Sequence, residues 1–343
     1  MSTALVTGAT GMVGSHIAER LLADGWRVRA LTRNPAAAAA VLPAGVELRA
    51  GDVLDEHSFI AAAQEANVVF HAAANIIVRG GWEAYRVTNI EGTRNAIAAA
   101  GRAGARLLQV SSVAVYGSST RYEAARRGGR TDEASVLAPL PERAFYARSK
   151  RESEELALGA HARGQVWATA VRPDVIYGPR DRQFVPRMAA LLRRRIPVPL
   201  LNGGRSILAV VHAANVADGA ILAATSDAAG GKAYNLANDY DVSVRRFFEL
   251  AGEGLGLRPL FVPMPLPLAR AGLRAVKSVA RIVTGGRFNL VSNSAIDFIA
   301  EDNPFSSDLA RRELGWNPKV RPETGVPEAF RDWAAREKRK GAT

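Results

Sequence analysis

Short apolar runs and amphipathic stretches alternate along the first two-thirds of this 343-residue chain. Runs of four to six residues rich in valine, leucine and alanine, bounded by glycine or polar residues, predict strands. Apolar residues spaced three and four apart predict helices between these runs. The predicted strands are 4–7, 26–31, 46–50, 67–71, 106–110, 166–171, 207–211 and 233–236, and the predicted helices include 85–100, 148–158, 213–224 and 244–255.

Strands that alternate with helices of these lengths are typical of an α/β protein with a Rossmann-type, doubly wound parallel sheet. The chain is long enough for a second, smaller lobe, which we expect to be mainly helical, C-terminal and substrate-binding. The expected cofactor-binding domain spans 1–175, with 207–232 returning to it. The expected substrate lobe consists of 176–206 and 233–343.

Composition narrows the class of protein. A hydrophobic content of 48% with 23% charged residues is typical of a soluble globular protein. The sequence has no cysteine, no apolar run of membrane-spanning length and no basic N-terminal leader, which predicts a cytoplasmic location and no thiolate metal site. The net charge is +12, yet no basic stretch carries interleaved aromatic residues, so we do not expect nucleic-acid binding. No metal is expected.

A glycine-rich turn follows the first strand directly. The sequence Gly8-Ala-Thr-Gly11-Met-Val-Gly14 lies between that strand and an amphipathic helix. In this context glycines permit a tight turn, a close approach of the backbone to phosphates, and close packing of helix on strand. The N-terminus of the helix also favours an anion, so the turn predicts binding of a dinucleotide.

The residue after the second strand indicates which nicotinamide cofactor fits. An acid there would accept a hydrogen bond from the ribose 2′-hydroxyl, but this sequence reads Thr32-Arg33-Asn34. Arg33 offers a planar fork of donors to a 2′-phosphate, which favours NADP over NAD. The alternative is an arginine that is simply solvated in a loop.

Tyr146 and Lys150 are four residues apart at the start of a helical run, so they share one helix face. A nearby ammonium favours the phenolate and lowers the pKa of a tyrosine, which can then move a proton to or from a substrate oxygen. Alone, this spacing is weak evidence, because an exposed helix with one core tyrosine has the same pattern. Ser111 and Ser112 end the fifth strand, where a serine is either a donor to that oxygen or part of a turn.

Taken together, these motifs resemble the extended short-chain dehydrogenase/reductase superfamily, that is, the NAD-dependent epimerase/dehydratase family. The resemblance runs from Gly8–Gly14 through Tyr146–Lys150 to Arg312-Glu-Leu-Gly-Trp316. It implies that Ser112, Tyr146 and Lys150 are catalytic. It also implies that the cofactor is bound by Gly8, Thr10, Gly11, Met12, Val13, Gly14, Arg33, Asp52, Val53, Ala72, Ala73, Ala74, Tyr146, Lys150, Pro173 and Val175.

Within the superfamily the chain resembles the branch of 3β-hydroxysteroid dehydrogenases and dihydroflavonol-type carbonyl reductases. This closer resemblance rests on the stretches 81–93 and 178–186 and on the long apolar region before Arg312. Val113 and Ala114 stand where sugar-nucleotide dehydratases have Asp-Glu, which removes the acid and base for elimination. Leu208 stands near the place of an arginine that nucleotide-sugar epimerases use, with Arg205 as the nearest substitute.

The expected activity is therefore that of an NAD(P)-dependent alcohol dehydrogenase or ketone reductase, with NADP preferred and NAD as the alternative. An apolar wall over the nicotinamide, formed from 259–300, predicts a hydrophobic substrate that is steroid-, aryl- or lipid-like. One rival reading is a nucleotide-sugar 4-epimerase, which would use the same three residues. Another is a noncatalytic NADP-binding sensor, which would have no need of them.

Two further stretches carry expectations. Residues 118–144 are polar and rich in glycine and arginine, and we interpret them as a lid near the substrate. Residues 268–283 place Arg270, Arg274, Lys277 and Arg281 on one helix face, opposite apolar residues. That face is either a solvated surface or a peripheral contact with an anionic membrane. A second copy of this chain, in a homodimer, is the other partner that we consider.

Overall fold

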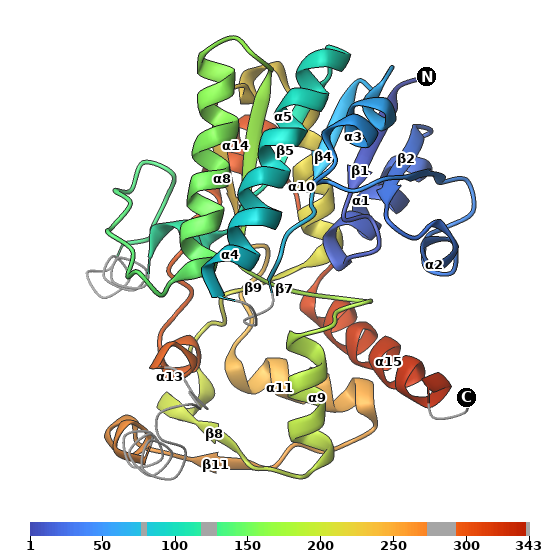
Figure 1. Ribbon diagram of the computed structural model, residues 1–343. Coiled ribbons are helices and arrows are strands. Elements are labelled where there is room, and N and C mark those ends of the chain that lie inside the picture. The colour runs from blue at the N-terminus through green and yellow to red at the C-terminus, as the bar shows by residue number, and fades with distance from the viewer. Residues whose placement is uncertain (77–80, 118–128, 273–292, 341–343) are drawn as a thin grey trace.

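Seven parallel strands form one sheet in the order β10-β6-β5-β4-β1-β2-β3 (Figure 1). The computed structural model describes residues 1–76, 81–117, 129–272 and 293–340. The strands are β1 (Thr3–Thr7), β2 (Arg27–Thr32), β3 (Glu47–Ala50), β4 (Val68–His71), β5 (Arg106–Val110), β6 (Ala168–Pro173) and β10 (Ala233–Leu236). Because every pairing is parallel, all their carboxyl ends lie along one edge of the sheet.

Helices cover both faces of this sheet (Figure 1). Side chains of β1 show the two sides: Ala4 and Val6 belong to one apolar core, and Leu5 belongs to the other. Burial on both faces is the reason that these strands read as continuous apolar runs. The first core is covered by α1 (Met12–Ala23), α10 (Ala213–Thr225) and α14 (Asp308–Leu314), and the second by α3 (Glu56–Ala63), α5 (Gly92–Ala103) and α8 (Phe145–Ala162).

Shorter helical segments connect these elements. A π-helix, η1, runs directly between α4 and α5, so the stretch predicted as one helix over 85–100 is helical without a break. The segments are α2 (Pro35–Ala39), α4 (Gly81–Tyr85), η1 (Arg86–Glu91), and the 3-10 turns η2 (Val113–Tyr116), η3 (Leu201–Gly204) and η4 (Asp227–Ala229).

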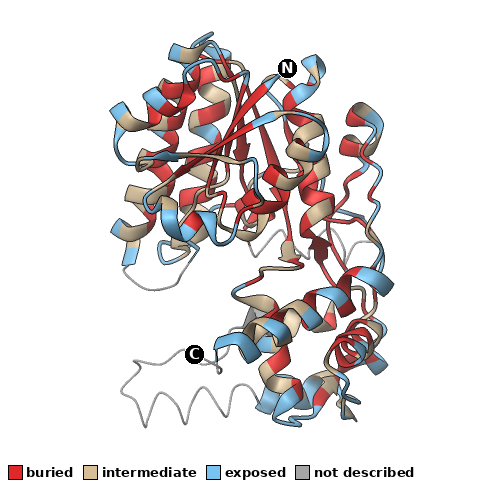
Figure 2. Cartoon of the chain, turned by 90° about the vertical axis from the view of Figure 1, so that its right-hand side faces the viewer, coloured by how far each residue is buried: buried red, intermediate tan, exposed pale blue. Residues whose placement is uncertain are grey.

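A smaller lobe lies beyond the carboxyl edge of the sheet (Figures 1 and 2). Its apolar core is aromatic: the ring of Phe247 lies 5.7 Å from those of Tyr177 and Phe184 and 6.2 Å from that of Phe330. Its elements are α9 (Phe184–Arg193), α11 (Val244–Leu255), α13 (Asn293–Ala300), α15 (Pro322–Lys340) and the parallel pair β8 (Val198–Leu200) and β11 (Phe261–Pro263). The predicted doubly wound sheet with a helical C-terminal region is confirmed.

The chain passes between the lobes near a second parallel pair, β7 (Val175–Tyr177) and β9 (Val210–His212). One expected boundary is wrong, because β10 was assigned to the small lobe and instead pairs with β6 as the seventh strand of the large sheet. A short apolar strand has the same pattern in either lobe, so periodicity did not decide its place. The rest of the proposed division into domains stays a prediction.

Side chains cover the outer edge of β10. Glu133 accepts a hydrogen bond from the backbone N–H of Asn235 at 2.6 Å, and Ser307 accepts one from Ala237 at 3.1 Å. Thr131 forms an isolated bridge to Phe305 beside them. This part of the predicted lid therefore packs on the sheet, whereas residues 118–128 lie outside the described residues.

The predicted basic helix over 268–283 lies mostly outside the described residues, which resume at 293. Up to residue 272 the chain is helical from Leu266, and Leu268 and Arg270 are exposed. Among the residues that the structure describes, no helix combines the length and apolar character needed to cross a membrane. Nor do the described residues include a cluster of side chains suited to a metal ion.

Candidate active site

The glycine turn brings three backbone segments so close together that side chains would not fit. A Cβ on Gly8, whose φ is +64°, would lie 2.7 Å from the backbone nitrogen of Ala73. A Cβ on Gly14 would lie 2.4 Å from the carbonyl oxygen of Gly8. Gly11 caps α1 without a side-chain hydrogen bond, so N–H groups of the first turn stay available to an anion. Closely approaching backbone and uncapped N–H groups at a helix N-terminus are features that favour an anion such as a diphosphate.

The ends of β1 and β4 are joined behind this turn. The hydroxyl of Thr7 is hydrogen-bonded to Nδ1 of His71 at 2.9 Å and accepts from the backbone N–H of Ala73 at 3.2 Å. Burial, with a smaller effect of the Lys150 charge, lowers the pKa of His71 to about 3, so its ring is neutral. Ala72, Ala73 and Ala74 follow His71 at the carboxyl edge, as expected.

The other predicted cofactor contacts lie along the same edge. Arg33 follows β2 and is exposed. Asp52 follows β3, and its carboxylate accepts from the N–H of Leu54 at 3.0 Å, while the carbonyl of Val53 accepts from Asn95 at 2.9 Å. Pro173 ends β6, and Val175 begins β7. The sheet therefore brings all the predicted cofactor residues to one edge.

Ser112, Tyr146 and Lys150 meet at the end of β5. Ser112 lies two residues beyond Val110, the last residue of β5, and its hydroxyl lies close enough to the Tyr146 phenol to affect the pKa of that phenol. Tyr146 is in the first turn of α8, and Lys150 is one turn further along the helix. The Lys150 ammonium donates to the carbonyl oxygen of Val110 at 2.5 Å. By contrast Ser111 is buried, and its hydroxyl has no partner among the described residues.

Burial dominates the protonation of this group. It lowers the pKa of Lys150 to about 8, against an opposing effect of the Glu154 carboxylate. It also raises the pKa of Tyr146, against an opposing effect of the Ser112 hydroxyl. The Lys150 ammonium is directed at the Val110 carbonyl, and the expectation that Lys150 lowers the pKa of Tyr146 stays a prediction.

Aromatic side chains cluster beside Tyr146. The ring of Tyr85 lies 6.4 Å from those of Tyr146 and Phe145, and the ring of Trp82 lies 6.3 Å from that of Phe145. Such surroundings suit an apolar substrate. The predicted apolar wall over 259–300 is seen only in part: Phe298 packs 6.1 Å from Phe184, and residues 273–292 lie outside the described residues.

Asn89 holds this region together, and sequence reasoning missed it. Its side-chain oxygen accepts from the N–H of Asn75 at 2.6 Å, and its amide nitrogen donates to the carbonyl of Asn75 at 3.1 Å and to the hydroxyl of Ser149 at 2.9 Å. Ser149 lies directly before Lys150. The available signal was a lone amide inside the stretch 81–93, which otherwise reads as helix.

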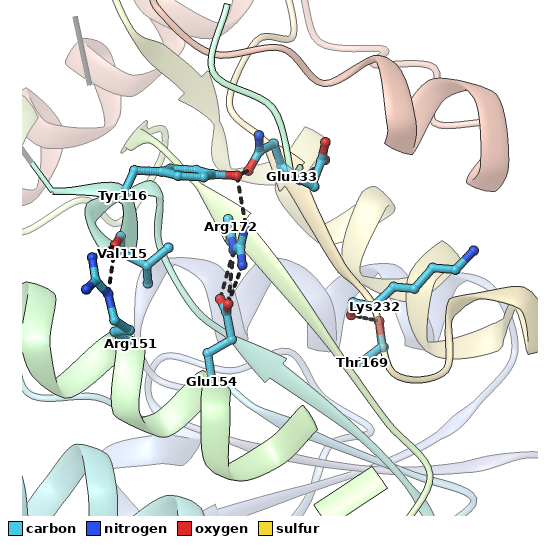
Figure 3. A network of polar contacts seen from close by, with 9 residues as sticks. Val115, Tyr116, Glu133, Arg151, Glu154, Thr169, Arg172 and Lys232 are labelled. Atoms are coloured by element: carbon cyan, nitrogen blue, oxygen red, sulfur yellow. Dashed lines mark hydrogen bonds and ion pairs between the residues drawn. The ribbon is translucent and has the colours of Figure 1, made fainter. Parts of the chain in front are cut away.

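A second buried polar cluster lies behind the three predicted catalytic residues, and Figure 3 shows it. The Arg172 guanidinium donates from Nε to both carboxylate oxygens of Glu154, at 3.0 and 3.1 Å, and from Nη1 to the hydroxyl of Tyr116 at 2.7 Å. That hydroxyl donates to Asn235 at 2.9 Å. Burial raises the pKa of Tyr116 to about 12. Sequence reasoning gave Glu154 no role, because it resembled a charge on a solvated helix face.

Comparison with known proteins agrees with this geometry. The 4-hydroxy-2-methyl-3-oxo-4-farnesyl-3,4-dihydroquinoline-1-oxide ketoreductase of Stigmatella aurantiaca is 30% identical over 94% of this chain and 93% of the relative. The decarboxylating sterol-4-alpha-carboxylate 3-dehydrogenase of Bos taurus is 28% identical over 73% of this chain and 69% of the relative. These names confirm the predicted resemblance to hydroxysteroid dehydrogenases and carbonyl reductases.

A solved structure of MoeE5 in complex with UDP-glucose and NAD is 25% identical, with a TM-score of 0.70 over 98% of this chain and 100% of that one. Residues 4–237, which contain the glycine turn, Ser112, Tyr146 and Lys150, match a single family. The predicted superfamily is therefore confirmed, and this chain belongs to the NAD dependent epimerase/dehydratase family.

Proposed function

We propose that this protein interconverts a hydroxyl and a carbonyl group on a hydrophobic small molecule, with NADP(H) preferred and NAD(H) as the alternative. The class is that of its relatives, which are named as a ketoreductase and a dehydrogenase. The observation that carries the proposal is that the hydroxyls of Ser112 and Tyr146 come together at the end of β5, with Lys150 one turn away on α8.

Each of these residues has a part in handling the proton. The Ser112 hydroxyl would donate to the substrate oxygen and fix its position beside Tyr146. The Tyr146 phenol would give that oxygen a proton during reduction, and the Tyr146 phenolate would remove one during oxidation. Lys150 would hold the cofactor ribose, and its ammonium favours the anionic form of a nearby phenol. When bound, the nicotinamide supplies or accepts the hydride.

The residues at the carboxyl edge fit a dinucleotide. Only glycine at positions 8 and 14 leaves room for the turn, and the uncapped N-terminus of α1 favours a diphosphate. Asp52 and Val53 would lie at the adenine, Ala72 to Ala74 along the cofactor, and Pro173 and Val175 near the nicotinamide. No acid follows β2, so nothing there repels a 2′-phosphate.

Arg33 is the residue on which the preference for NADP depends. If its guanidinium pairs with the 2′-phosphate, the substitution Arg33→Ala should weaken NADPH binding by about 1.5–3 kcal/mol, which is typical of a hydrogen bond to a charged group. Binding of NADH should change little, because NADH lacks that phosphate. Isothermal titration calorimetry with both cofactors measures the difference, and equal losses would mean that Arg33 does not contact the phosphate.

A hydrophobic substrate is supported by the rings of Trp82, Tyr85 and Phe145 beside Tyr146. The alternative of a nucleotide-sugar 4-epimerase is disfavoured by Leu208, which is 1% exposed in the small-lobe core where a diphosphate ligand would be expected. The alternative of a noncatalytic sensor is disfavoured by the intact catalytic set.

A screen with NADPH decides between the first two functions. We expect oxidation of NADPH with steroid, aryl or long-chain keto compounds, and no stabilisation or turnover with UDP-glucose or dTDP-glucose. Stabilisation by a nucleotide sugar, with none by the hydrophobic set, would favour the epimerase. Dinucleotide binding without turnover of any compound would favour the sensor.

The remaining expectations concern partners and location. Peripheral contact with an anionic membrane through 268–283, a homodimer and a cytoplasmic location stay predictions. Salt-sensitive binding to anionic vesicles would support the membrane contact, since screening weakens such attraction.

A further inference from the structure

The segment from Gly178 to Arg182 joins β7 to α9 and is fixed on both sides. Arg180, with φ +67°, donates two hydrogen bonds of 2.6 Å to the carboxylate of Glu19 on α1. Its backbone N–H donates to Asp332 on α15 at 2.8 Å, and Arg336 of the same helix donates to the carbonyl of Asp181 at 3.0 Å. The backbone position of the next residue, Arg182, is thereby set by both lobes.

Arg182 extends from this segment to the glycine turn. Its Nη2 donates to the carbonyl oxygen of Thr10 at 3.1 Å, directly before Gly11, the N-cap of α1. The side chain is exposed, and within the described part of the chain it forms no ion pair. Its charge is therefore available, in contrast to that of Arg180, which Glu19 neutralises.

Two independent features thus favour an anion at one place. The first turn of α1 offers backbone N–H groups that no side chain caps, and a guanidinium from the small lobe lies against the preceding residue. Arginine is well suited to phosphate, because its planar fork donates two parallel hydrogen bonds. None of the predicted cofactor contacts comes from the small lobe beyond Val175.

We propose that Arg182 binds the cofactor's pyrophosphate, so that a small-lobe residue completes the cofactor site formed by the glycine turn. The proposal rests on the proposed function, because it requires a dinucleotide at the turn. It also separates two arginines by role: Arg182 recognises the pyrophosphate common to NAD and NADP, and Arg33 recognises the 2′-phosphate.

Calorimetric titration with two fragments tests this separation. ADP-ribose carries the pyrophosphate without a 2′-phosphate, and 2′-AMP carries the 2′-phosphate without a pyrophosphate. The variant Arg182→Ala should bind ADP-ribose about tenfold or more weakly, as expected for a lost charged hydrogen bond, and should bind 2′-AMP like the wild type. Arg33→Ala should show the reverse. Arg187→Ala, which removes another exposed arginine, on α9, should change neither affinity.

Arg182→Gln provides a second test, since it retains a donor to Thr10 and loses the charge. A charge-dependent contact predicts weak binding of ADP-ribose with an unchanged melting temperature in this variant. A merely structural bridge to Thr10 predicts wild-type affinity in Arg182→Gln, or equal losses for both fragments in Arg182→Ala, and either result would overturn the proposal. A wild-type protein that binds no dinucleotide would overturn the proposed function as well, whereas wild-type affinity in Arg182→Ala would overturn this inference alone.

Discussion

Helix α8 carries two buried polar clusters about one turn apart, and they differ in how fully their charges are paired. Arg172 and Glu154 form an ion pair in which both side chains are under a tenth exposed, and the hydroxyl of Tyr116 accepts a further donor of the guanidinium. Among the residues that the structure describes, the direct partner of Lys150 is a single backbone carbonyl, and burial lowers its pKa to about 8.

The two clusters also differ in the pKa shifts of their members. Burial opposes the charge of Arg172, but the Glu154 carboxylate outweighs this effect and raises the pKa of that guanidinium, which therefore stays charged, while burial raises the pKa of Tyr116 and keeps its phenol neutral. By contrast, burial brings the pKa of the partly paired Lys150 down to about 8, and shifts of this kind are frequent at functional sites. Both clusters on this helix are therefore buried, and they differ in how fully the buried charge is paired.

The largest expected effect comes from breaking the paired cluster. The substitution Arg172→Met leaves the Glu154 carboxylate buried without its partner, so the free energy of unfolding should fall by about 3–5 kcal/mol. Urea unfolding measures it. The double variant Arg172→Met with Glu154→Leu removes both charges and should recover most of the loss. A loss under about 1 kcal/mol in the single variant would mean that the pair is not structurally important.

The next effect concerns turnover. The substitution Tyr146→Phe removes the proton carrier with little change of shape, so kcat should fall by about 10² or more while NADPH still binds. Tyr116→Phe is the matched control from the paired cluster. It should retain turnover and lose about 1–3 kcal/mol of stability, because it leaves a donor of Arg172 unsatisfied. Near-normal turnover in Tyr146→Phe would remove that residue from the mechanism.

The smallest expected effect is a pH dependence of stability that comes from buried histidines that stay neutral. Burial lowers the pKa of both His71 and His212 to about 3, from an ordinary value of 6.5. Below pH 6.5 the unfolded chain binds protons that the folded chain does not, so stability falls as the pH falls towards 3. Each histidine should lower the free energy of unfolding by about 1 kcal/mol between pH 7 and 5.5.

A non-titrating variant isolates one of these contributions. His212→Asn keeps a side-chain acceptor for the N–H of Ala214, which His212 caps, and it should remove the contribution of about 1 kcal/mol that His212 makes to this pH dependence. Urea unfolding at both pH values measures it, and an unchanged dependence would place the proton uptake elsewhere.

Most of the fold could be predicted because its signal is local. Strands such as Val68–His71 are buried on both faces, and their apolar runs reveal them. The predicted cofactor residues follow strand ends, and a parallel sheet brings those ends together whatever the details of packing. The order of the motifs along the chain implied that Ser112 and Tyr146 belong to one site, and in the structure the two side chains lie close together.

The features that the sequence did not predict depend on contacts between residues far apart in the chain. Glu154 and Glu155 are adjacent acids on one helix, but only the strand that presents Arg172 distinguishes the buried acid from the solvated one. Arg182 reaches Thr10 across a gap of 172 residues, which no periodicity encodes. The same limit applies to the placement of β10.

The covered edge of β10 bears on how copies of this chain can associate. An uncovered edge strand is a template for the strand of another molecule, and proteins avoid such pairing by capping or charging the edge. Here Glu133 and Ser307 occupy the N–H groups of Asn235 and Ala237. At the opposite edge, β3 is four residues long and carries Glu47 and Arg49. Both edge strands of the sheet are therefore poorly suited to pair with a strand of another molecule, which disfavours aggregation through the edges of the sheet.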